Sequence, residues 1–473
     1  MVIAPSEIAA SNIGSTAERR PTVFWTTMLF LYAAIVMFIP IRRYALPIPL
    51  PFALEPYRAI IAVLLLGLIV AAARRKHFRW QPVVWGWPIA IFLWTMLASM
   101  MFSSESLTET ELIGTGLSNL LQLSLLTATI VLVRQLLTTE RIVMALLQFI
   151  VFAGVVVGIF AFVERVTRTN VFLLLGNFLP LSLIRDAEEA VRSGGARSYG
   201  SAQHPIALAV LFCMIIPLAI YLMRFSPWPR NPINRRVVYS IAVGFLLLGL
   251  LTTISRTATV TLGVMLLVTL ILRPRLGAIL LAAAIPLAVI AAMVLPKLVE
   301  SMLLSLLDTE SLIASQMTSI GMAGQGRLAD LAPAFAEVAQ SPFFGTGLGS
   351  RIVEGENANA YILDNQWLGT LMETGVLGVI GLVALFVWPA IRMLSFSFRS
   401  GAAESRAFLT FAIAISAVGY ATSMFLYDSF AFMQTLLVLA MLYAIAAWAM
   451  TARADEHSLL FSPAVSVQSV GAR

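Results

Sequence analysis

Long apolar runs that contain almost no charge recur along the whole chain, and they restrict its fold more than any other feature. Of the 473 residues, 59% are hydrophobic and 12% are charged, whereas soluble domains carry about a quarter charged residues. A helix needs about 20 apolar residues to cross a bilayer. The runs therefore predict an all-α polytopic membrane protein, and they exclude a soluble multidomain enzyme and a disordered chain.

Twelve such runs predict about 12 transmembrane helices, at residues 22–40, 54–73, 82–102, 112–133, 142–163, 205–223, 237–254, 257–272, 276–296, 366–391, 407–427 and 429–450. The expected division is a cytoplasmic tail at 1–21, helices 1–9 within 22–296 with an extracytoplasmic loop at 164–204, a large extracytoplasmic loop at 297–365, helices 10–12 within 366–450 and a cytoplasmic tail at 451–473. In the large loop, the apolar spacing predicts an interfacial helix at 298–318 and a short helix at 327–340.

Charged residues are divided unequally between the two sides of these helices. One side holds 19 basic and 6 acidic residues (net +13), and the other holds 12 basic and 18 acidic residues (net −6), which together give the net charge of +7. The positive-inside rule places the first side, with both termini, in the cytoplasm. No dense basic run lies in a soluble segment, so we expect no nucleic-acid partner. The single cysteine and three scattered histidines predict neither a disulfide framework nor a metal centre.

Arginines near the outer ends of the runs are candidate ligands for an anion, because charge close to hydrocarbon is costly and usually functional. Arg256 lies in a turn between two apolar runs, where it is either a snorkelling anchor or an anion ligand. Arg327 follows a glycine-rich stretch at a predicted helix start, where it is either a phosphate ligand or a surface residue. Arg165 and Arg197 add two more guanidinium groups in the loop at 164–204.

Acidic residues and a histidine at the same outer ends are candidates for proton transfer. Asp364 precedes a run and is either a helix N-cap or a base. Glu373 lies inside that run, where it has either a functional role or a purely structural hydrogen bond to another helix. His204 begins another run and is a base, a sugar contact or a simple helix start, and Glu164 is a further possible base.

Two further patterns restrict the chemistry. The segment Gly345-Thr-Gly-Leu-Gly lacks the Lys-Ser/Thr of a nucleotide-binding loop, and we interpret it as a tight turn. The large loop has no Asp-x-Asp motif, so we expect arginines rather than a divalent ion to stabilise a diphosphate leaving group. We accordingly expect a metal-independent reaction without a cofactor.

A series of motifs between about 197 and 380 resembles the bacterial O-antigen ligase and Wzy-type polysaccharide polymerase superfamily. The motifs are Arg197-Ser-Tyr-Gly-Ser-Ala-Gln-His-Pro, Ser255-Arg256, Arg327, Ser341-Pro-Phe-Phe-Gly-Thr-Gly-Leu-Gly, Asp364-Asn-Gln-Trp-Leu and Glu373-Thr-Gly-Val-Leu-Gly. The resemblance implies the all-helical C-type glycosyltransferase (GT-C) class and a polyprenyl-diphosphate-linked glycan donor. Ligases of the superfamily commonly carry histidine where Asp364 stands and asparagine near His204, and these departures favour a polymerase.

The combined expectation is a glycosyltransferase that polymerises lipid-linked repeat units at the outer face of a bacterial cytoplasmic membrane. Its predicted catalytic residues are Asp364, Arg256 and Arg327, and its predicted substrate-binding residues are Arg197, His204, Glu164, Arg165 and Glu373. Expected partners are the polyprenyl-diphosphate-linked donor, the glycan acceptor, the bilayer, a flippase and a chain-length regulator. The alternatives are a ligase that transfers finished glycan to a lipid, protein or wall acceptor, and a 12-span small-solute transporter, which would show broken helices with charges at the membrane midplane.

The charge asymmetry makes a direct prediction about topology. Cysteines introduced at Ser315 and Glu354 should react with an impermeant thiol reagent in intact cells made permeable only at any outer membrane, because both positions lie in the predicted outer loop. Labelling that requires opening of the cytoplasmic membrane would reverse the orientation.

Overall fold

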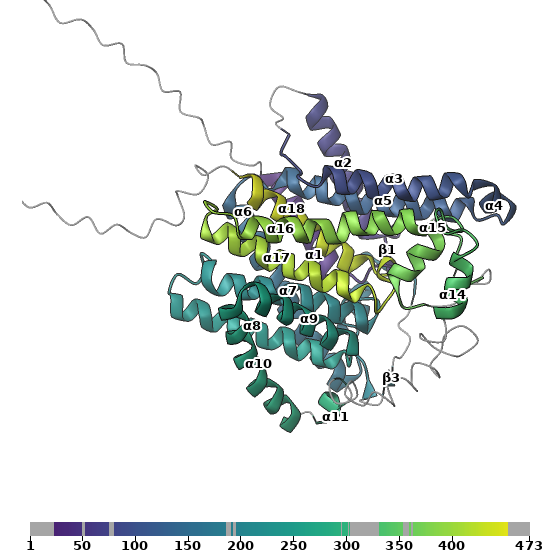
Figure 1. Ribbon diagram of the computed structural model, residues 1–473. Coiled ribbons are helices and arrows are strands. Elements are labelled where there is room, and N and C mark those ends of the chain that lie inside the picture. Colours follow the sequence, from purple (N-terminus) through teal and green to yellow (C-terminus); the bar gives the residue numbers. More distant parts are fainter. Residues whose placement is uncertain are drawn as a thin grey trace, which may run out of the picture.

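A computed structural model describes residues 23–49, 53–74, 80–185, 191–192, 195–294, 296–300, 302, 331–352, 359–360 and 363–452. In this part of the chain, long helices lie side by side in a bundle (Figure 1). The long helices are α1 (Val23–Phe38), α2 (Pro56–Ala73), α3 (Gly86–Phe102), α5 (Ile113–Leu136), α6 (Glu140–Thr167), α7 (Pro205–Phe225), α8 (Pro232–Thr252), α9 (Arg256–Leu272), α10 (Pro274–Val294), α15 (Gln366–Leu382), α17 (Glu404–Ser423) and α18 (Met433–Thr451).

Shorter elements complete the described fold. Helix α15 continues through the π-helical segment η4 (Val383–Val387) into α16 (Trp388–Ser397). The other short elements are α4 (Ser104–Glu109), α11 (Pro296–Val299), α14 (Leu331–Val338), the 3₁₀ helices η1 (Val171–Asn177) and η5 (Ser429–Ala431), and the strands β1 (Tyr44–Ala45), β2 (Ser182–Leu183), β3 (Val191–Arg192) and β4 (Gly195–Ala196). The strands form two antiparallel pairs, β1 with β2 and β3 with β4.

Each of the twelve predicted apolar runs overlaps one of the long helices over most of its length, with ends that differ by up to about five residues for most of them. Within the described residues, nine helical segments are long and apolar enough to cross a membrane, and α1, α3 and α9 are apolar but shorter. The all-α polytopic class is therefore confirmed, whereas the count of twelve crossings stays a prediction. At 1.5 Å per residue, a 17-residue helix is about 25 Å long, slightly less than a hydrocarbon core of about 30 Å.

Helices α7 and α18 form the centre of the bundle. Nearly all of their residues are buried, whereas α2 and α10 are largely exposed at opposite edges (Figure 1). Small residues allow close packing next to this centre: the Cα atom of Gly158 in α6 would lie 2.7 Å from a Cβ atom added at Gly249 in α8. Such contacts between glycines are typical of membrane helices, because lipid tails leave packing and hydrogen bonding to hold the helices together.

The loops predicted to lie outside meet at one end of the bundle, which we call the loop end and define by α4, α14 and strand β1 (Figure 1). Pairing of β1 with β2 joins the first loop to the loop at 164–204. Ser103 beside α4 donates to the Gly345 carbonyl at 3.3 Å, and the amide of Gln366 donates to the Met424 carbonyl at 2.8 Å. The structure thus places these loops on the same side, and the charge asymmetry predicts that this side is extracytoplasmic.

Helix α15 is broken at Gly375, which has φ 64° and ψ −165°. The amides of Thr346 and Gly347 donate to the carbonyls of Met372 and Glu373 at 3.1 and 2.8 Å. The amides of Val376 and Leu377 donate to the carbonyls of Pro342 and Phe343 at 2.9 and 3.3 Å. A loop from outside the helix therefore satisfies the backbone groups that the break leaves unpaired. Non-helical backbone at membrane depth is tolerated only when it is buried in this way.

The glycine-rich segment predicted as a tight turn is this docked loop. It does contain turns, since the amide of Gly345 donates to the Ser341 carbonyl at 2.9 Å. It also packs so closely on α15 that a Cβ atom at Gly345 would overlap the backbone of Glu373. The amides of Thr346 and Gly347 are bound to α15 carbonyls, so they are not available to cradle a phosphate.

Two predictions in the large loop fall mainly outside the described residues. Of the interfacial helix expected at 298–318, the structure describes only 298–300 and 302. The short helix expected at 327–340 is confirmed in its described part, as α14. Arg327 lies outside the described residues.

The break in α15 predicts a large difference between two glycine substitutions. Gly375→Ala should lower the free energy of unfolding by about 3 kcal/mol or more, because its Cβ atom would meet a positive φ and overlap the backbone of Phe343. Gly401→Ala is the matched control: Gly401 also has positive φ (89°), but nothing lies within 4 Å of its Cβ position, so the cost should stay at about 1–2 kcal/mol. Denaturant titration of the purified protein in detergent measures both values, and equal losses would contradict the docking argument.

Candidate active site

Seven of the eight predicted site residues lie in the described part of the chain, and all seven lie toward the loop end. They form two groups. One group surrounds residues 195–204, and the other consists of Asp364, just before α15, and Glu373 within α15. The segment 424–432, between α17 and α18, contacts both groups.

The last turn of α6 holds the backbone of residues 195–200. Glu164 accepts the amide of Tyr199 at 3.1 Å with Oε1 and the amide of Gly200 at 2.8 Å with Oε2. Arg165, the next residue, donates to the carbonyl of Ala196. Glu164 and Arg165 therefore position this segment, and their predicted role in binding substrate stays a prediction.

Arg197 joins this segment to the turn between α8 and α9. Its Nε atom donates to the carbonyl of Thr253 at 2.8 Å, and the amide of Ser198 donates to the carbonyl of Thr252 at 3.1 Å. Arg256 is the first residue of α9, three positions after Thr253. The structure thus brings together two predicted arginines that are 59 positions apart in the sequence.

His204 begins α7. Its Nδ1 atom accepts the amide of Ile206 at 3.2 Å, so the expectation of a helix start is confirmed. As the acceptor of this hydrogen bond, Nδ1 carries no proton. The imidazole lies with its centroid 5.6 Å from the ring of Phe432, which connects this group to the segment 424–432.

Asp364 is not the N-cap of α15, and that alternative is wrong. The cap is Asn365, whose side chain accepts the amide of Leu368 at 3.1 Å. Asp364 lies one residue earlier, with φ 51°, a region that few non-glycine residues adopt. The carboxylate of Asp428 accepts the amide of Asn365 at 3.2 Å and so fixes the backbone next to Asp364.

A polar cavity of about 250 Å³ lies beside these residues at the loop end. Glu373 lines it together with Asp428, Arg42 and Arg351, three charged residues that the sequence analysis did not single out. The sequence does contain a signal for Asp428, because this residue lies between two apolar runs just as Arg256 does. Asp364 is not among the lining residues, although its neighbour Leu363 is.

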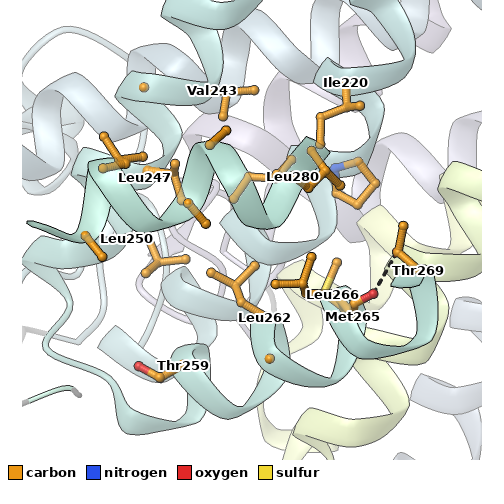
Figure 2. A pocket seen from close by; sticks show the side chains of 18 of the residues that line it. Ile220, Val243, Leu247, Leu250, Thr259, Leu262, Met265, Leu266, Thr269 and Leu280 are labelled. Carbon is orange, nitrogen blue, oxygen red and sulfur yellow. Dashed lines mark hydrogen bonds between the residues drawn. The ribbon is translucent and has the colours of Figure 1, made fainter. Parts of the chain in front are cut away.

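An apolar cavity of about 790 Å³ lies between α7, α8, α9, α10 and α17. Figure 2 shows side chains such as Leu247 and Leu262 around it. The hydroxyl of Thr269 donates a hydrogen bond to the carbonyl of Met265 at 2.7 Å, so it adds little polarity to the cavity wall (Figure 2). Thr259, which also lines the cavity, is about one helical turn from Arg256. The apolar cavity therefore begins close to the turn between α8 and α9, residues 253–256, which we call the arginine turn.

This arrangement defines a class of protein: a polytopic helical membrane protein with a large apolar cavity, one of whose lining residues, Thr259, lies three positions after Arg256. Such a site suits a molecule with a lipid chain and an anionic head. Residues 241–383 match the family described as O-antigen ligase (Wzy_C). The match contains the positions of Arg256, Arg327, Asp364 and Glu373, and it confirms the resemblance to the O-antigen ligase and Wzy-type superfamily of glycosyl-transferring membrane enzymes. None of the curated proteins compared with the chain matches it.

Substitutions of the two neighbouring residues before α15, Asp364 and Asn365, should show which of them caps the helix. Asn365→Ala should lower the free energy of unfolding by about 1 kcal/mol, because it removes the oxygen that caps the amide of Leu368. Asp364→Asn leaves this cap in place, since Asn365 supplies the capping oxygen and asparagine tolerates positive φ. Unfolding in detergent measures both. Unchanged stability of Asn365→Ala would contradict the assignment of the cap.

Proposed function

We propose that the protein is a polysaccharide polymerase that joins polyprenyl-diphosphate-linked repeat units at the outer face of a bacterial cytoplasmic membrane. The observation that carries this proposal is the apolar cavity that begins about one turn from Arg256. The match of residues 241–383 to the O-antigen ligase family supports the same class of reaction.

The donor lipid would occupy the apolar cavity, and its diphosphate would lie at the arginine turn. A volume of about 790 Å³ accommodates part of a polyprenyl chain and leaves the remainder in the bilayer. The exposed position of α10 gives the lipid a lateral path into this cavity. Arg256 and Arg327 would bind the diphosphate through paired N–H donors, the geometry in which a guanidinium exceeds an ammonium group.

The reaction is a substitution at the anomeric carbon of the donor glycan. The oxygen of an acceptor sugar hydroxyl forms the new bond to this carbon, and the bond from the carbon to the diphosphate oxygen breaks. Polyprenyl diphosphate leaves with the electron pair, and Arg256 and Arg327 stabilise its developing charge. The proton of the hydroxyl passes to the carboxylate of Asp364 and from there to water.

The departures from the ligase pattern at Asp364 and near His204 favour a polymerase, with a ligase as the second candidate. The transporter alternative has one feature in its favour, since α15 is broken next to Glu373. In a transporter, however, the backbone groups freed by such a break coordinate the solute. In this protein the backbone groups freed by the break are hydrogen-bonded to residues 342–347, which argues that the break has a structural role and does not bind a solute. A flippase and a chain-length regulator remain the proposed protein partners.

The glycans of a deletion strain test the proposed function. If the protein is a polymerase, single lipid-linked repeat units should accumulate and long surface chains should disappear, because no other step joins the units. Mass analysis of the lipid-linked and surface glycans measures both pools. Long lipid-linked chains that fail to reach an acceptor would identify a ligase, and unchanged glycans would refute both.

The proposed roles predict how variants behave in an assay with purified protein and lipid-linked donor. Arg256→Lys should reduce the rate of transfer about 10²- to 10³-fold, as expected when a hydrogen-bond donor to a developing negative charge is lost. Asp364→Asn should reduce it roughly a hundredfold, and Asp364→His should retain more activity because imidazole also accepts a proton. Arg399→Lys, an exposed change on the predicted cytoplasmic side, is the control and should be neutral. Wild-type rates for Arg256→Lys and Asp364→Asn would remove both residues from the mechanism.

A further inference from the structure

We propose that the polar cavity at the loop end binds one neutral sugar ring of the acceptor glycan. This inference rests on the proposed function and adds a binding site to it. The cavity of about 250 Å³ is smaller than the ~300–1,000 Å³ of sites for drug-sized ligands, so it suits a single ring rather than an oligosaccharide.

The charges around the cavity favour a neutral ligand. Two guanidinium groups (Arg42 and Arg351) and two carboxylates (Glu373 and Asp428) line it, so their formal charges cancel. Arg351 is also paired with the carboxylate of Glu337 at 3.4 Å. A phosphate placed here would face two carboxylates, whereas a sugar hydroxyl can donate to a carboxylate and accept from a guanidinium at the same time.

Uncharged groups in the lining fit a sugar ring as well. Asn119 and Gln122 of α5 line the cavity. The amide of Asn119 offers donors and an acceptor for hydroxyl groups, and Gln122, whose nitrogen donates to the Phe430 carbonyl at 3.4 Å, offers its side-chain oxygen. Phe430 adds an apolar surface for the C–H face of a ring. A site for a small molecule usually combines an apolar wall with a few precisely placed polar groups.

Hydrogen bonds within the protein hold the wall of the cavity in place. The side-chain oxygen of Gln366 accepts the amide of Phe430 at 2.8 Å, and its nitrogen donates to the hydroxyl of Thr370 at 3.0 Å. Asp428 is fixed by the amide of Asn365, the residue that follows Asp364. Asp428 therefore both lines the cavity and contacts the residue next to the proposed base, Asp364.

Gly369 allows the cavity to be filled without damaging the helix. It lines the cavity, and a Cβ atom added there would meet only the Cδ1 atom of Leu363, at an ordinary 3.9 Å. Gly369→Leu should thus block the site, and Gly369→Ala should narrow it. Gly114→Leu is the matched control, because Gly114 lies in α5 outside the cavity and nothing lies within 4 Å of its Cβ position.

The experiment is a binding measurement on purified full-length protein in nanodiscs. The probe is the lipid-free repeat oligosaccharide, released by mild acid from the lipid-linked glycan of the deletion strain and followed by saturation-transfer NMR. Wild type and Gly114→Leu should bind it. Gly369→Leu should lose binding, and Asn119→Ala should weaken it roughly tenfold, the loss expected for a hydrogen bond. Gel filtration and unfolding in detergent establish that each variant is folded.

The outcomes separate this inference from the proposed function. Arg256→Lys should bind the oligosaccharide normally while it fails in transfer, because the arginine turn holds the diphosphate. Equal binding by wild type and folded Gly369→Leu, or no binding by a wild type that makes polymer, would overturn the sugar site and leave the polymerase intact. Binding that Gly369→Leu abolishes, in a protein that never consumes lipid-linked donor, would overturn the polymerase and keep the sugar site.

Discussion

Four backbone hydrogen bonds between residues 342–347 and the broken helix α15 determine much of the loop end. They satisfy the carbonyls of Met372 and Glu373 and the amides of Val376 and Leu377. Without them, unpaired backbone groups would lie at membrane depth, at a cost of several kcal/mol each. The break holds Glu373 at the end of a helical turn, where its side chain reaches the polar cavity. The docked loop continues to Leu348 and Arg351, which line the same cavity.

A second constraint is the way α8 and α9 diverge from the turn that joins them. The turn is tied to residues 195–200 by Arg197 and Ser198, and that segment is tied in turn to Glu164. The helices then leave space between them, which α10 covers only loosely. An apolar cavity thus begins beside an arginine that follows a hydrogen-bonded turn. This matters because binding energy is lost when charged groups must first be ordered around a ligand.

Three of the predicted site residues make structural hydrogen bonds that account for their side-chain types without a catalytic role. Glu164 uses both carboxylate oxygens on backbone amides, Arg165 donates to a backbone carbonyl, and His204 caps α7. The capping role that would have explained Asp364 belongs to Asn365. Asp364 has positive φ at the mouth of a helix, a conformation that clusters at functional sites, and its catalytic role stays a proposal.

Much of the architecture could be predicted from the sequence, because a segment that crosses hydrocarbon must satisfy its own backbone hydrogen bonds. The apolar runs were therefore expected to be helices, and each overlaps one. The superfamily also followed from local motifs, which keep their order in the chain. Only the tertiary structure revealed the cavity shared by Arg42, Gln122, Glu373 and Asp428, since these residues come from four separate segments. The same holds for the break at Gly375, because a glycine inside an apolar run is tolerated in a straight helix. Its conformation depends on a loop some 30 residues earlier in the chain, and no local pattern encodes that contact.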